Sequence, residues 1–433
     1  MATEREGVGV VGVGWVGLVT ATCFAELGHQ IVALDVNEAK VESLRRGEVT
    51  IHEPGLAELL VKNSERITFT MSMDEVLDSA RLLFCCVDTP PTYSGDADLS
   101  RVRSVVDQLP EDSDHALVMK STVPSGTGAS IRRDKPDLRY VSCPEFLKEG
   151  SAIQDFMHPD RVVVGADAGS EDAADAVERL YEPLGGEIVR TDVASAEMIK
   201  LASNAFLATK ISFINEIANV CEQTGADVTE VARGMGLDER IGASFLKAGI
   251  GYGGSCFPKD VSALKQLAGN SGYHFQLLNA VIEVNELQKR RVIAKLEKHL
   301  GTLVDKRIAL LGLAFKPDTD DMREASSLVL SARLQGEGAN VVAYDPVAED
   351  SASAMLPDVE MADSASAALE GADAAVLVTE WPEFSELDWA AARGSMASAV
   401  LIDGRNYLDA EKLRSAGFAY EGIGRPDGQN GGK

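Results

Sequence analysis

The stretch GYGGSCFPKD, residues 251–260, contains a group that can do covalent chemistry. Cys256 follows a run of glycines and comes just before Lys259 and Asp260. A cysteine that only fills a core does not need glycines, a proline and two charges around it. Glycines let another group approach the backbone closely, and a thiolate beside a positive charge is a strong nucleophile. The pattern therefore predicts a thiol at the point where a ligand meets the chain.

The other cysteines do not form a recognisable site. Cys23, Cys85, Cys86 and Cys221 lie in apolar runs, which is typical of small buried hydrophobes. No pair has C-x-x-C spacing, and no histidine cluster lies near any cysteine. We therefore expect neither a metal site nor a disulfide framework.

A second group of residues has the spacing of a dinucleotide-binding turn. An apolar run leads into G-x-G-x-x-G, and a helical pattern follows it. The first glycine makes the tight turn, the second lets the backbone reach a diphosphate, and the third packs helix on strand. The next apolar run ends in Asp35, a carboxylate placed to accept ribose hydroxyls and to repel a 2′-phosphate. The pattern predicts NAD rather than NADP, bound at Gly12, Gly14 and Gly17, with Trp15 and Val16 between the last two.

Further polar residues follow later strands and one helix. Thr122 and Glu145 each come after an apolar run, at the edge of the sheet where ligands bind in such folds. Thr89, in CVDTPP, either contacts the cofactor or stands beside prolines that only shape the loop. Lys200 and Asn204 are four apart, so they project from one face of a helix. That pair can stabilise a negative oxygen, or it can be a solvated helix surface.

These groups need a fold that positions them, and the chain alternates strand and helix patterns. We expect strands in VGVVGVG, QIVALD, ERITFT, ARLLFCCV, HALVMKST, LRYVSC and DRVVVG, and later in KRIALLGLAF, ANVVAYD, ADAAVLVTE and ASAVLIDGRN. Two long helical segments, 193–225 and roughly 276–299, lie between the two sets. The fold class is therefore α/β. It comprises a Rossmann-like doubly wound domain over 1–192, a central helical connection over 193–300, a smaller Rossmann-like α/β domain over 301–423 and a disordered tail over 424–433.

Composition narrows the partners. The chain has 433 residues, 45% hydrophobic and 25% charged, which is typical of two or three folded domains. Its formal net charge of −27 argues against nucleic acid as a partner, and the spread-out acidity would suit a high-salt environment. The N-terminus lacks a secretory leader pattern, and no apolar run is long enough to cross a bilayer. We expect a cytoplasmic protein that does not bind membranes.

Seven stretches, taken together and in order, resemble the nucleotide-sugar dehydrogenases of the UDP-glucose/GDP-mannose dehydrogenase family. They cover nearly the whole chain: GVGWVG, STVPSGT, PEFLKEGSAIQDFMHPDRVVVG, EMIKLASNAF, ERIGASFLKAGIGYGGSCFPKD, LGLAFKPDTDDMRE and LIDGRN. The resemblance implies a four-electron oxidation of carbon 6 of UDP-glucose to UDP-glucuronate, through a thiohemiacetal and a thioester on cysteine, with two NAD reduced. Three alternatives stay open: GDP-mannose or a UDP-N-acetylhexosamine as substrate, a two-electron dehydrogenase with a structural Cys256, and an inactive nucleotide-sugar sensor.

The resemblance also implies roles for particular residues. Cys256 is the nucleophile, Lys200 and Asn204 steady the negative oxygen, Asp260 with Thr122 and a water manages the first proton transfer, and Glu145 assists the hydrolytic water. The cofactor-binding set is Gly12, Gly14, Trp15, Val16, Gly17, Asp35, Thr89, Thr122, Glu149 and Lys259. The substrate-binding set is Glu145, Phe146, Leu147, Lys148, Lys200, Asn204, Arg240, Phe245, Leu246, Lys247, Tyr252, Gly253, Lys316 and Arg405, with Arg323 weaker because its acidic neighbours could make it a surface ion pair.

Two further expectations follow from the resemblance. Arg240 matches a position that reaches into the neighbouring subunit's site, which implies a homodimer built on the central helices. The glycines around Tyr252 are expected to let the backbone lie against the sugar. Three departures from the family pattern are Trp15 for tyrosine, an acidic Asp88 beside the diphosphate position, and Lys148 for arginine.

Overall fold

The computed structural model describes residues 7–111 and 114–426, which divide into two compact units. The first unit contains the described residues up to Ser203 together with Ser262–Tyr273. The second contains Asn204–Val261 and the described residues from His274 onward. Helices α9 (Val193–Thr224) and α11 (Phe257–Asn270) each contribute residues to both units.

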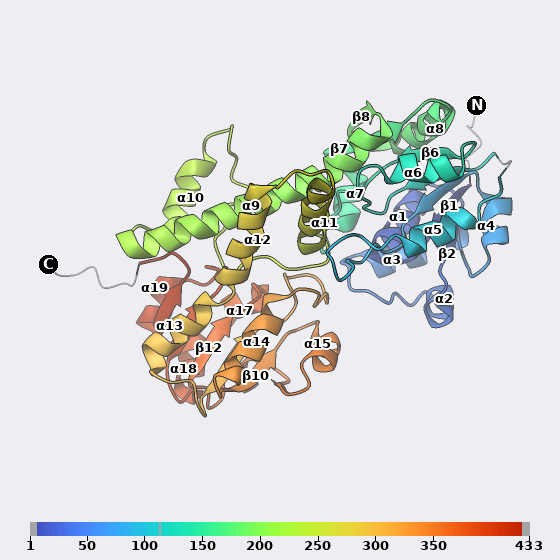
Figure 1. The fold of residues 1–433 in the computed structure, drawn as a ribbon. Coiled ribbons are helices and arrows are strands. Elements are labelled where there is room, and N and C mark those ends of the chain that lie inside the picture. The colour runs from blue at the N-terminus through green and yellow to red at the C-terminus, as the bar shows by residue number, and fades with distance from the viewer. Residues whose placement is uncertain (1–6, 112–113, 427–433) are drawn as a thin grey trace. The chain divides into compact units, whose positions relative to one another are not determined.

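An eight-stranded sheet forms the centre of the first unit, in the order β3-β2-β1-β4-β5-β6-β7-β8 (Figure 1). All neighbouring strands are parallel except β6 and β7. The strand order reverses between β1 and β4, and ligands bind at the carboxyl ends of strands at such a point. The strands are β1 (Val8–Val11), β2 (Ile31–Leu34), β3 (Ile67–Thr70), β4 (Leu82–Cys85), β5 (Ala116–Met119), β6 (Arg139–Ser142), β7 (Arg161–Ala166) and β8 (Glu187–Thr191).

Helices cover both faces of this sheet, so its central strands are buried on both sides. Val8 and Val10 of β1 belong to one buried cluster, and Val11 belongs to another. Continuous apolar runs are the expected result of such two-sided burial. The helices are α1 (Trp15–Glu26), α2 (Glu38–Arg45), α3 (Leu56–Lys62), α4 (Met73–Ser79), α5 (Ser100–Asp107), α6 (Thr127–Asp134), α7 (Ala152–Met157) and α8 (Glu171–Tyr181), with short 3-10 turns at Ser64–Arg66 and Glu182–Leu184.

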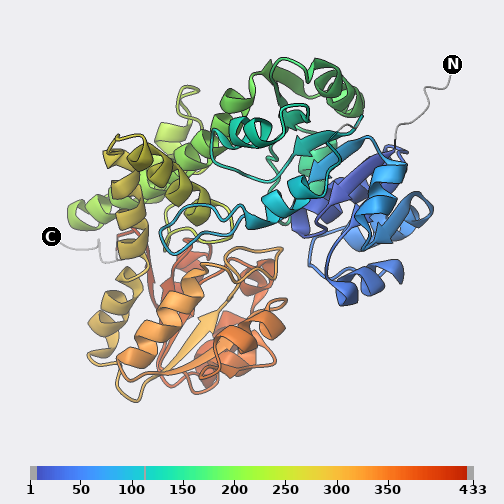
Figure 2. The same cartoon turned by 45° about the vertical axis from the view of Figure 1, so that its right-hand side comes forward.

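The second unit contains a six-stranded parallel sheet in the order β11-β10-β9-β12-β13-β14. The orange and red part of the chain in Figure 2 contains this sheet. Ile308 and Leu310 of β9 belong to one buried cluster, and Ala309 and Leu311 belong to the other, so this sheet is also covered on both faces. The strands are β9 (Arg307–Leu311), β10 (Asn340–Tyr344), β11 (Glu360–Met361), β12 (Ala374–Leu377), β13 (Val400–Asp403) and β14 (Ala419–Gly422).

The remaining helices of the second unit lie before this sheet in the sequence or between its strands. Helix α9 ends where Gly225 takes a left-handed conformation, with φ of 77°. The helices are α10 (Val228–Gly236), α12 (Gln276–Gln288), α13 (Arg291–Leu300), α14 (Ser326–Gly336), α15 (Glu349–Met355), α16 (Ala365–Leu369), α17 (Pro382–Glu386), α18 (Trp389–Ser395) and α19 (Ala410–Ser415).

The α/β fold class with two Rossmann-like sheets is confirmed, and so are all eleven expected strands. The single helical segment expected over 276–299 was wrong, because the chain breaks at Lys289–Arg290 into α12 and α13. Strands β8, β11 and β14 and helix α11 were not anticipated.

The structure also bears on two expectations about the whole chain, one about membrane-spanning segments and one about the C-terminal tail. In residues 7–111 and 114–426, no helix is both long and apolar enough to span a bilayer. The expected disordered tail begins too early at Gly424, because Gly424 donates a hydrogen bond to Glu222 at 2.9 Å and Arg425 pairs with Asp227. The rest of that tail, 427–433, lies outside the described residues.

Candidate active site

The glycine-rich turn between β1 and α1 has three glycines with three different surroundings. Gly12 has φ of 91°, and a Cβ there would lie 3.0 Å from the carbonyl oxygen of Cys86. A Cβ on Gly17 would lie 1.8 Å from the carbonyl oxygen of Gly12. A Cβ on Gly14, which precedes the first residue of α1, would have no atom closer than 3.8 Å. Gly12 and Gly17 are thus required by the fold itself, whereas Gly14 leaves the helix N-terminus open to a ligand.

Asp35 follows β2 and braces this turn. Its Oδ2 accepts the Val13 N–H at 3.1 Å and pairs with the Lys40 ammonium at 3.2 Å, while its Oδ1 accepts the Asn37 N–H at 3.0 Å. The side chain is largely buried at the carboxyl edge of the sheet. These contacts use three of the about four lone-pair directions of a carboxylate, and the remaining one, on Oδ1, can accept a further hydrogen bond.

The acidic departure at Asp88 lies beside the turn. Its Oδ1 would be 3.8 Å from a Cβ on Gly14, the nearest atom to that position. Its other oxygen forms an ion pair with Arg101 of α5 at 2.7 Å, and both side chains are exposed. Arg101 therefore offsets the negative charge that made Asp88 awkward beside a diphosphate.

The loops after β4 and β5 are joined by Thr89. Its buried hydroxyl donates to the carbonyl oxygen of Thr122 at 2.8 Å. Thr122 itself is half-buried. The contact ties the two predicted cofactor-contacting loops together at the carboxyl edge of the sheet.

Glu145, which follows β6, and Lys200 of α9 form a buried ion pair. Their Oε1 and Nζ atoms are 2.8 Å apart, and the other Glu145 oxygen accepts the Leu147 N–H at 2.6 Å. Burial raises the pKa of Glu145, but the charge and hydrogen bond of Lys200 outweigh burial, and the net pKa is lowered. Glu145 is therefore ionised at neutral pH. The Phe146 ring lies below the Lys200 ammonium, 5.4 Å from its centroid.

The rest of the predicted loop 145–150 is held by a residue that the motif search missed. Glu53 is buried, and its Oε2 accepts both the Trp15 indole N–H at 2.9 Å and the Gly150 N–H at 2.8 Å. Its Oε1 accepts the Ala152 N–H at 2.8 Å, at the start of α7. Glu53 thus joins the glycine-rich turn to the predicted substrate loop, and tryptophan at position 15 supplies the donor. Within that loop, Lys148 pairs with Asp155 at 3.1 Å.

In the second unit, Cys256 stands directly before the first residue of α11. Its carbonyl oxygen accepts the Asp260 N–H at 2.9 Å, the first bond of the helix. The Ser255 hydroxyl lies 3.6 Å from its sulfur. The six cysteines all lie within the described ranges and none forms a disulfide; five are buried and Cys256 is half-buried. Burial raises the pKa of Cys23 to about 12 and that of Cys85 to about 11, so those thiols stay protonated.

Asp260 lies one turn into α11 and is almost fully buried. Its Oδ2 accepts the Asn204 amide at 2.6 Å, and its Oδ1 pairs with Lys259 at 2.6 Å. Asp260 therefore contacts three other predicted site residues of this unit: Asn204, Cys256 and Lys259.

The glycines before Cys256 are required by the chain's own packing. A Cβ on Gly251 would lie 2.7 Å from Asn285 Oδ1, one on Gly253 would lie 2.2 Å from the carbonyl oxygen of Glu324, and one on Gly254 would meet the Phe315 ring at 2.7 Å. The expectation that they leave room for a sugar is therefore not needed to explain them.

The basic residues of the second unit differ in the contacts that they make within the protein. The Arg405 guanidinium donates to the carbonyl oxygens of Val378, Gly251 and Phe315, at 2.7, 2.9 and 3.4 Å. Lys316 lies over the Phe315 ring, 5.4 Å from its centroid. Arg323 forms a two-pronged ion pair with Asp321 and is exposed, the surface pairing that made it the weaker candidate.

The residues 245–247 form an irregular segment after α10. Phe245 takes a left-handed conformation with φ of 64°, which is rare for a bulky residue. Leu246 is buried, and Lys247 lies 3.5 Å from Glu380 and over the Tyr407 ring. Strained backbone of this kind is often found at functional sites.

The remaining predicted site residues differ in their exposure and contacts. Arg240 is largely exposed and pairs with Asp238 at 2.6 Å. Tyr252 is buried, with its ring edge-on to Phe257 at 5.8 Å. Val16 and Glu149 are half-buried in the first unit.

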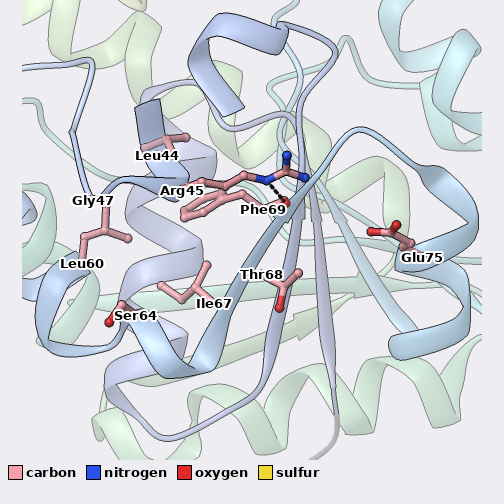
Figure 3. A pocket seen from close by; sticks show the side chains of 9 residues that line it. All are labelled: Leu44, Arg45, Gly47, Leu60, Ser64, Ile67, Thr68, Phe69 and Glu75. Carbon is pink, nitrogen blue, oxygen red and sulfur yellow. Dashed lines mark hydrogen bonds between the residues drawn. The ribbon is translucent and has the colours of Figure 1, made fainter. Parts of the chain in front are cut away.

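A separate hollow of about 340 Å³ lies against the edge strand β3 (Figure 3). Residues of α2, α3 and β3 line most of it, and the Arg45 side chain crosses it to donate to the carbonyl oxygen of Phe69 at 3.0 Å. None of its lining residues belongs to the predicted site.

Comparison with known families gives three consecutive matches. Residues 6–185 match the NAD binding domain of the UDP-glucose/GDP-mannose dehydrogenase family, residues 194–287 match its central domain, and residues 309–410 match its UDP binding domain.

Individual relatives extend these matches over nearly the whole chain. The UDP-glucose 6-dehydrogenase TuaD of Bacillus subtilis is 47% identical, covering 97% of this chain and 93% of the relative. The UDP-glucose 6-dehydrogenase AglM of Haloferax volcanii is 42% identical over 96% of this chain and 99% of the relative. The solved structure of a UDP-glucose dehydrogenase from Pyrobaculum islandicum is 37% identical with a TM-score of 0.90, covering 98% of this chain and 99% of that one.

Proposed function

The chain belongs to the UDP-glucose/GDP-mannose dehydrogenase family, and from that premise we propose that it oxidises UDP-glucose to UDP-glucuronate. The proposal rests on its NAD binding and UDP binding domains and on relatives named for that substrate at up to 47% identity. Conversion of a primary alcohol to a carboxylate removes four electrons, so each sugar reduces two NAD.

NAD fits the residues of the first unit. The open position at Gly14, the start of α1 and the carboxylate of Asp35 offer a diphosphate and a ribose the groups that they need. Trp15, Val16, Thr89, Thr122 and Glu149 complete the proposed cofactor set within the first unit, and Lys259 of the second unit is its remaining proposed member. When bound, NAD supplies the hydride acceptor for both oxidations.

Cys256 is proposed to hold the half-oxidised sugar. Its thiolate adds to the carbon-6 aldehyde and forms a thiohemiacetal, whose oxidation gives a thioester that water cleaves to the acid and the free thiol. The start of α11 favours a negative charge on this sulfur. Its exposure, compared with the five buried cysteines, is the single observation in the molecule that most favours this role.

Charged and polar groups around the chemistry have separate proposed tasks. Lys200 and Asn204 would stabilise the negative oxygen that develops at carbon 6. Asp260, with Thr122 and a water, would take the first proton. Glu145, ionised and paired with Lys200, would accept a proton from the hydrolytic water.

The UDP moiety is assigned to the second unit. Lys316 and Arg405 would contact the nucleotide, and Phe245, Leu246 and Lys247 would contact the diphosphate and sugar, with Tyr252 and Gly253 beside Cys256. Phe146, Leu147 and Lys148 of the first unit complete the set. Arg405 would act in part through the loops whose carbonyl groups it already holds.

We also propose a homodimer. Phe206, Phe213 and Val220, seven residues apart on α9, are all exposed. Such a row of apolar side chains is expected to be covered by a partner. Arg240, largely exposed, would reach the partner's site. Light scattering should report twice the chain mass, and a monomer at micromolar concentration would contradict the proposal.

The proposed location is the cytoplasm. None of the six cysteines, all of which lie in the described part of the chain, forms a disulfide, which fits a reducing compartment.

The test is a panel of nucleotide sugars with NAD. UDP-glucose should give two NADH per sugar and UDP-glucuronate, with slower reaction of GDP-mannose and UDP-N-acetylhexosamines. A faster reaction of another sugar would change the assigned substrate. One NADH with free aldehyde would exclude the four-electron mechanism.

A further inference from the structure

The backbone that leads to Cys256 runs through the interior of the second unit. Residues 248–254 are all buried, although none belongs to a helix or strand. A buried backbone cannot leave its N–H and C=O groups without partners, because each would cost free energy comparable to a lost hydrogen bond. The partners of this loop therefore reveal what holds it in place.

Three buried amide side chains form hydrogen bonds with the backbone of this loop, at Gly249 and at Tyr252. Asn215 of α9 accepts the Gly249 N–H at 2.9 Å, and Gln288 of α12 donates to the carbonyl oxygen of Gly249 at 2.9 Å. Asn285, one turn before Gln288, accepts the Tyr252 N–H at 2.8 Å and donates to the Tyr252 carbonyl at 3.1 Å. Asn215, Asn285 and Gln288, which we call the amide clamp, are each at most 4% exposed.

Backbone and arginine contacts hold the residues between and after the clamped ones. The Ile250 N–H donates to the carbonyl oxygen of Gly404 at 2.9 Å, and the Gly254 N–H donates to that of Arg323 at 2.9 Å. Arg405 donates to the Gly251 carbonyl at 2.9 Å. The loop is thus held by hydrogen bonds at residues 249–252 and at Gly254.

The loop sequence is fitted to the clamp. Gly251 has φ of 92°, a conformation that other residues rarely adopt. A Cβ at this position would also lie 2.7 Å from Asn285 Oδ1. A side chain on residue 251 would therefore push Asn285 away from the Tyr252 backbone.

We propose that Asn285, supported by Gln288 and Asn215, is a positioning residue that sets where the Cys256 sulfur lies. This inference rests on the proposed role of Cys256 as nucleophile. Covalent attack needs the reacting atoms about 3–3.5 Å apart and aligned, and a displacement of about 1 Å can cost on the order of 100-fold in rate. Only three residues separate the clamped Tyr252 from Cys256. A displacement of the loop backbone at Tyr252 would therefore also displace the Cys256 sulfur.

The test compares Asn285→Ala with the control Gln335→Ala in the full-length protein. Gln335 also donates its amide to a backbone carbonyl of the second unit, that of Asp358 at 2.9 Å, but on an exposed surface. We expect Asn285→Ala to lower kcat by about tenfold or more, with KM for NAD and UDP-glucose within about twofold. The control should match the parent. A kcat for Asn285→Ala equal to that of the control overturns the inference.

Alkylation by iodoacetamide, followed residue by residue by mass spectrometry, separates positioning from general unfolding. In Asn285→Ala we expect Cys256 to react faster than in the parent, while Cys221, buried in the same unit, stays protected. Equal acceleration at both cysteines would mean that the variant only opens the unit. No change at Cys256 would mean that the clamp does not restrain it.

A double-mutant cycle with Gly251→Ala checks the fit between loop and clamp. Because each change removes the same Asn285–Tyr252 contact, their effects on kcat should not add. Additive losses would contradict the inference. Should these variants not fold, hydrogen exchange of the parent gives the answer, since the Gly249 and Tyr252 amides must exchange far more slowly than those of the exposed residues 239–241, 243 and 244.

The labelling result also distinguishes this inference from the proposed function. A parent protein that makes only one NADH defeats the thioester mechanism, yet the contrast between Cys256 and Cys221 still tests the clamp. A parent that makes two NADH, with Asn285→Ala fully active, defeats the clamp alone.

Discussion

The first six strands of the first sheet, β3-β2-β1-β4-β5-β6, have the same order as the six strands of the second sheet, but the turns at the two sheet centres differ. In each, the central strand is followed by a left-handed glycine, Gly12 with φ of 91° or Gly312 with φ of 86°. In the first unit α1 begins three residues after that glycine, whereas after Gly312 the next helix, α14, begins only at Ser326. The second unit therefore has no helix N-terminus at the position where a dinucleotide diphosphate would bind.

The aspartate after the second strand of each sheet shows the same contrast. Asp345 accepts five N–H groups, from Leu313, Ala314, Val347, Ala348 and the Trp381 indole. Asp35 accepts two backbone N–H groups and pairs with Lys40. Asp345 is thus fully used by the fold, while Asp35 keeps capacity for a ligand. The regions that match the NAD binding and UDP binding domains thus share a six-strand order, and they differ in the length of this turn and in how many hydrogen bonds the aspartate already accepts.

The largest effect should come from removing the sulfur. Cys256→Ser replaces the nucleophile in the second unit and leaves the first unit unchanged. We expect turnover to fall at least about 1,000-fold, with the Kd for NAD within about twofold by fluorescence titration. Full activity of this variant would contradict the covalent role of Cys256 and the proposal that the second unit supplies the nucleophile.

The next effect concerns the open glycine of the first unit. Gly14→Val should weaken NAD binding by on the order of 100-fold, because its side chain would occupy the diphosphate position. Thermal stability should change little, since the nearest atom to a Cβ there is 3.8 Å away. The matched change in the second unit is Ala314→Gly, at a buried position that already bears a Cβ. It should lower thermal stability without altering NAD binding. If Gly14→Val instead changed only stability and Ala314→Gly changed NAD binding, the proposed difference between the two turns would be wrong.

A third prediction compares the two aspartates by urea unfolding. Asp345→Asn should cost about 2–4 kcal/mol, because either orientation of the amide NH₂ faces at least two N–H donors. Asp35→Asn should cost less, because Asp35 accepts fewer N–H groups. It should also raise the preference for NADP relative to NAD by about tenfold, measured as a ratio of kcat/KM. Equal losses of stability would mean that Asp35 is as fully used by the fold as Asp345.

The smallest effect should be a pH dependence confined to the first unit. Glu197 of α9 accepts the Gly126 and Gly128 N–H groups and the Tyr140 hydroxyl, and burial raises its pKa to about 7. The folded state then holds a proton that the unfolded chain releases near 4.5, so this stabilisation is complete below that pH and is lost as pH rises through about 7.

The measurement is the melting temperature from pH 5 to 8 in the parent and in Glu197→Gln. Because glutamine does not titrate, the variant should gain a few degrees relative to the parent as pH rises. A difference between the two that does not vary with pH would show that Glu197 does not titrate in this range.

The strands were predictable where both faces of a sheet are buried. Such strands are continuous apolar runs, and all eleven were found from the sequence. The three missed strands lie at sheet edges or are very short: Glu187–Thr191 is polar and partly exposed, and Glu360–Met361 has two residues. The break between α12 and α13 carries no proline or glycine, so the helical pattern runs through it.

Candidate groups for the chemistry could also be named from the sequence, because nucleophiles, glycine spacings and strand-end carboxylates are local patterns, and their roles stay predictions. The groups that hold them were not. Glu53 is 97 residues from Gly150, and Asn285 is 33 residues from Tyr252. A glutamate or an asparagine outside a motif looks like a surface residue until the fold brings a distant backbone against it.

The amino-acid sequence by itself determined the α/β class, and it predicted the dinucleotide turn and the residues proposed to react, since each depends on neighbours within a few positions. Only the tertiary structure decided which side chains support them: the Glu145–Lys200 pair, the Glu53 junction and the amide clamp before Cys256. The physical reason is that a buried polar group must find its partner wherever the fold supplies one, and that partner is chosen by packing rather than by proximity along the chain.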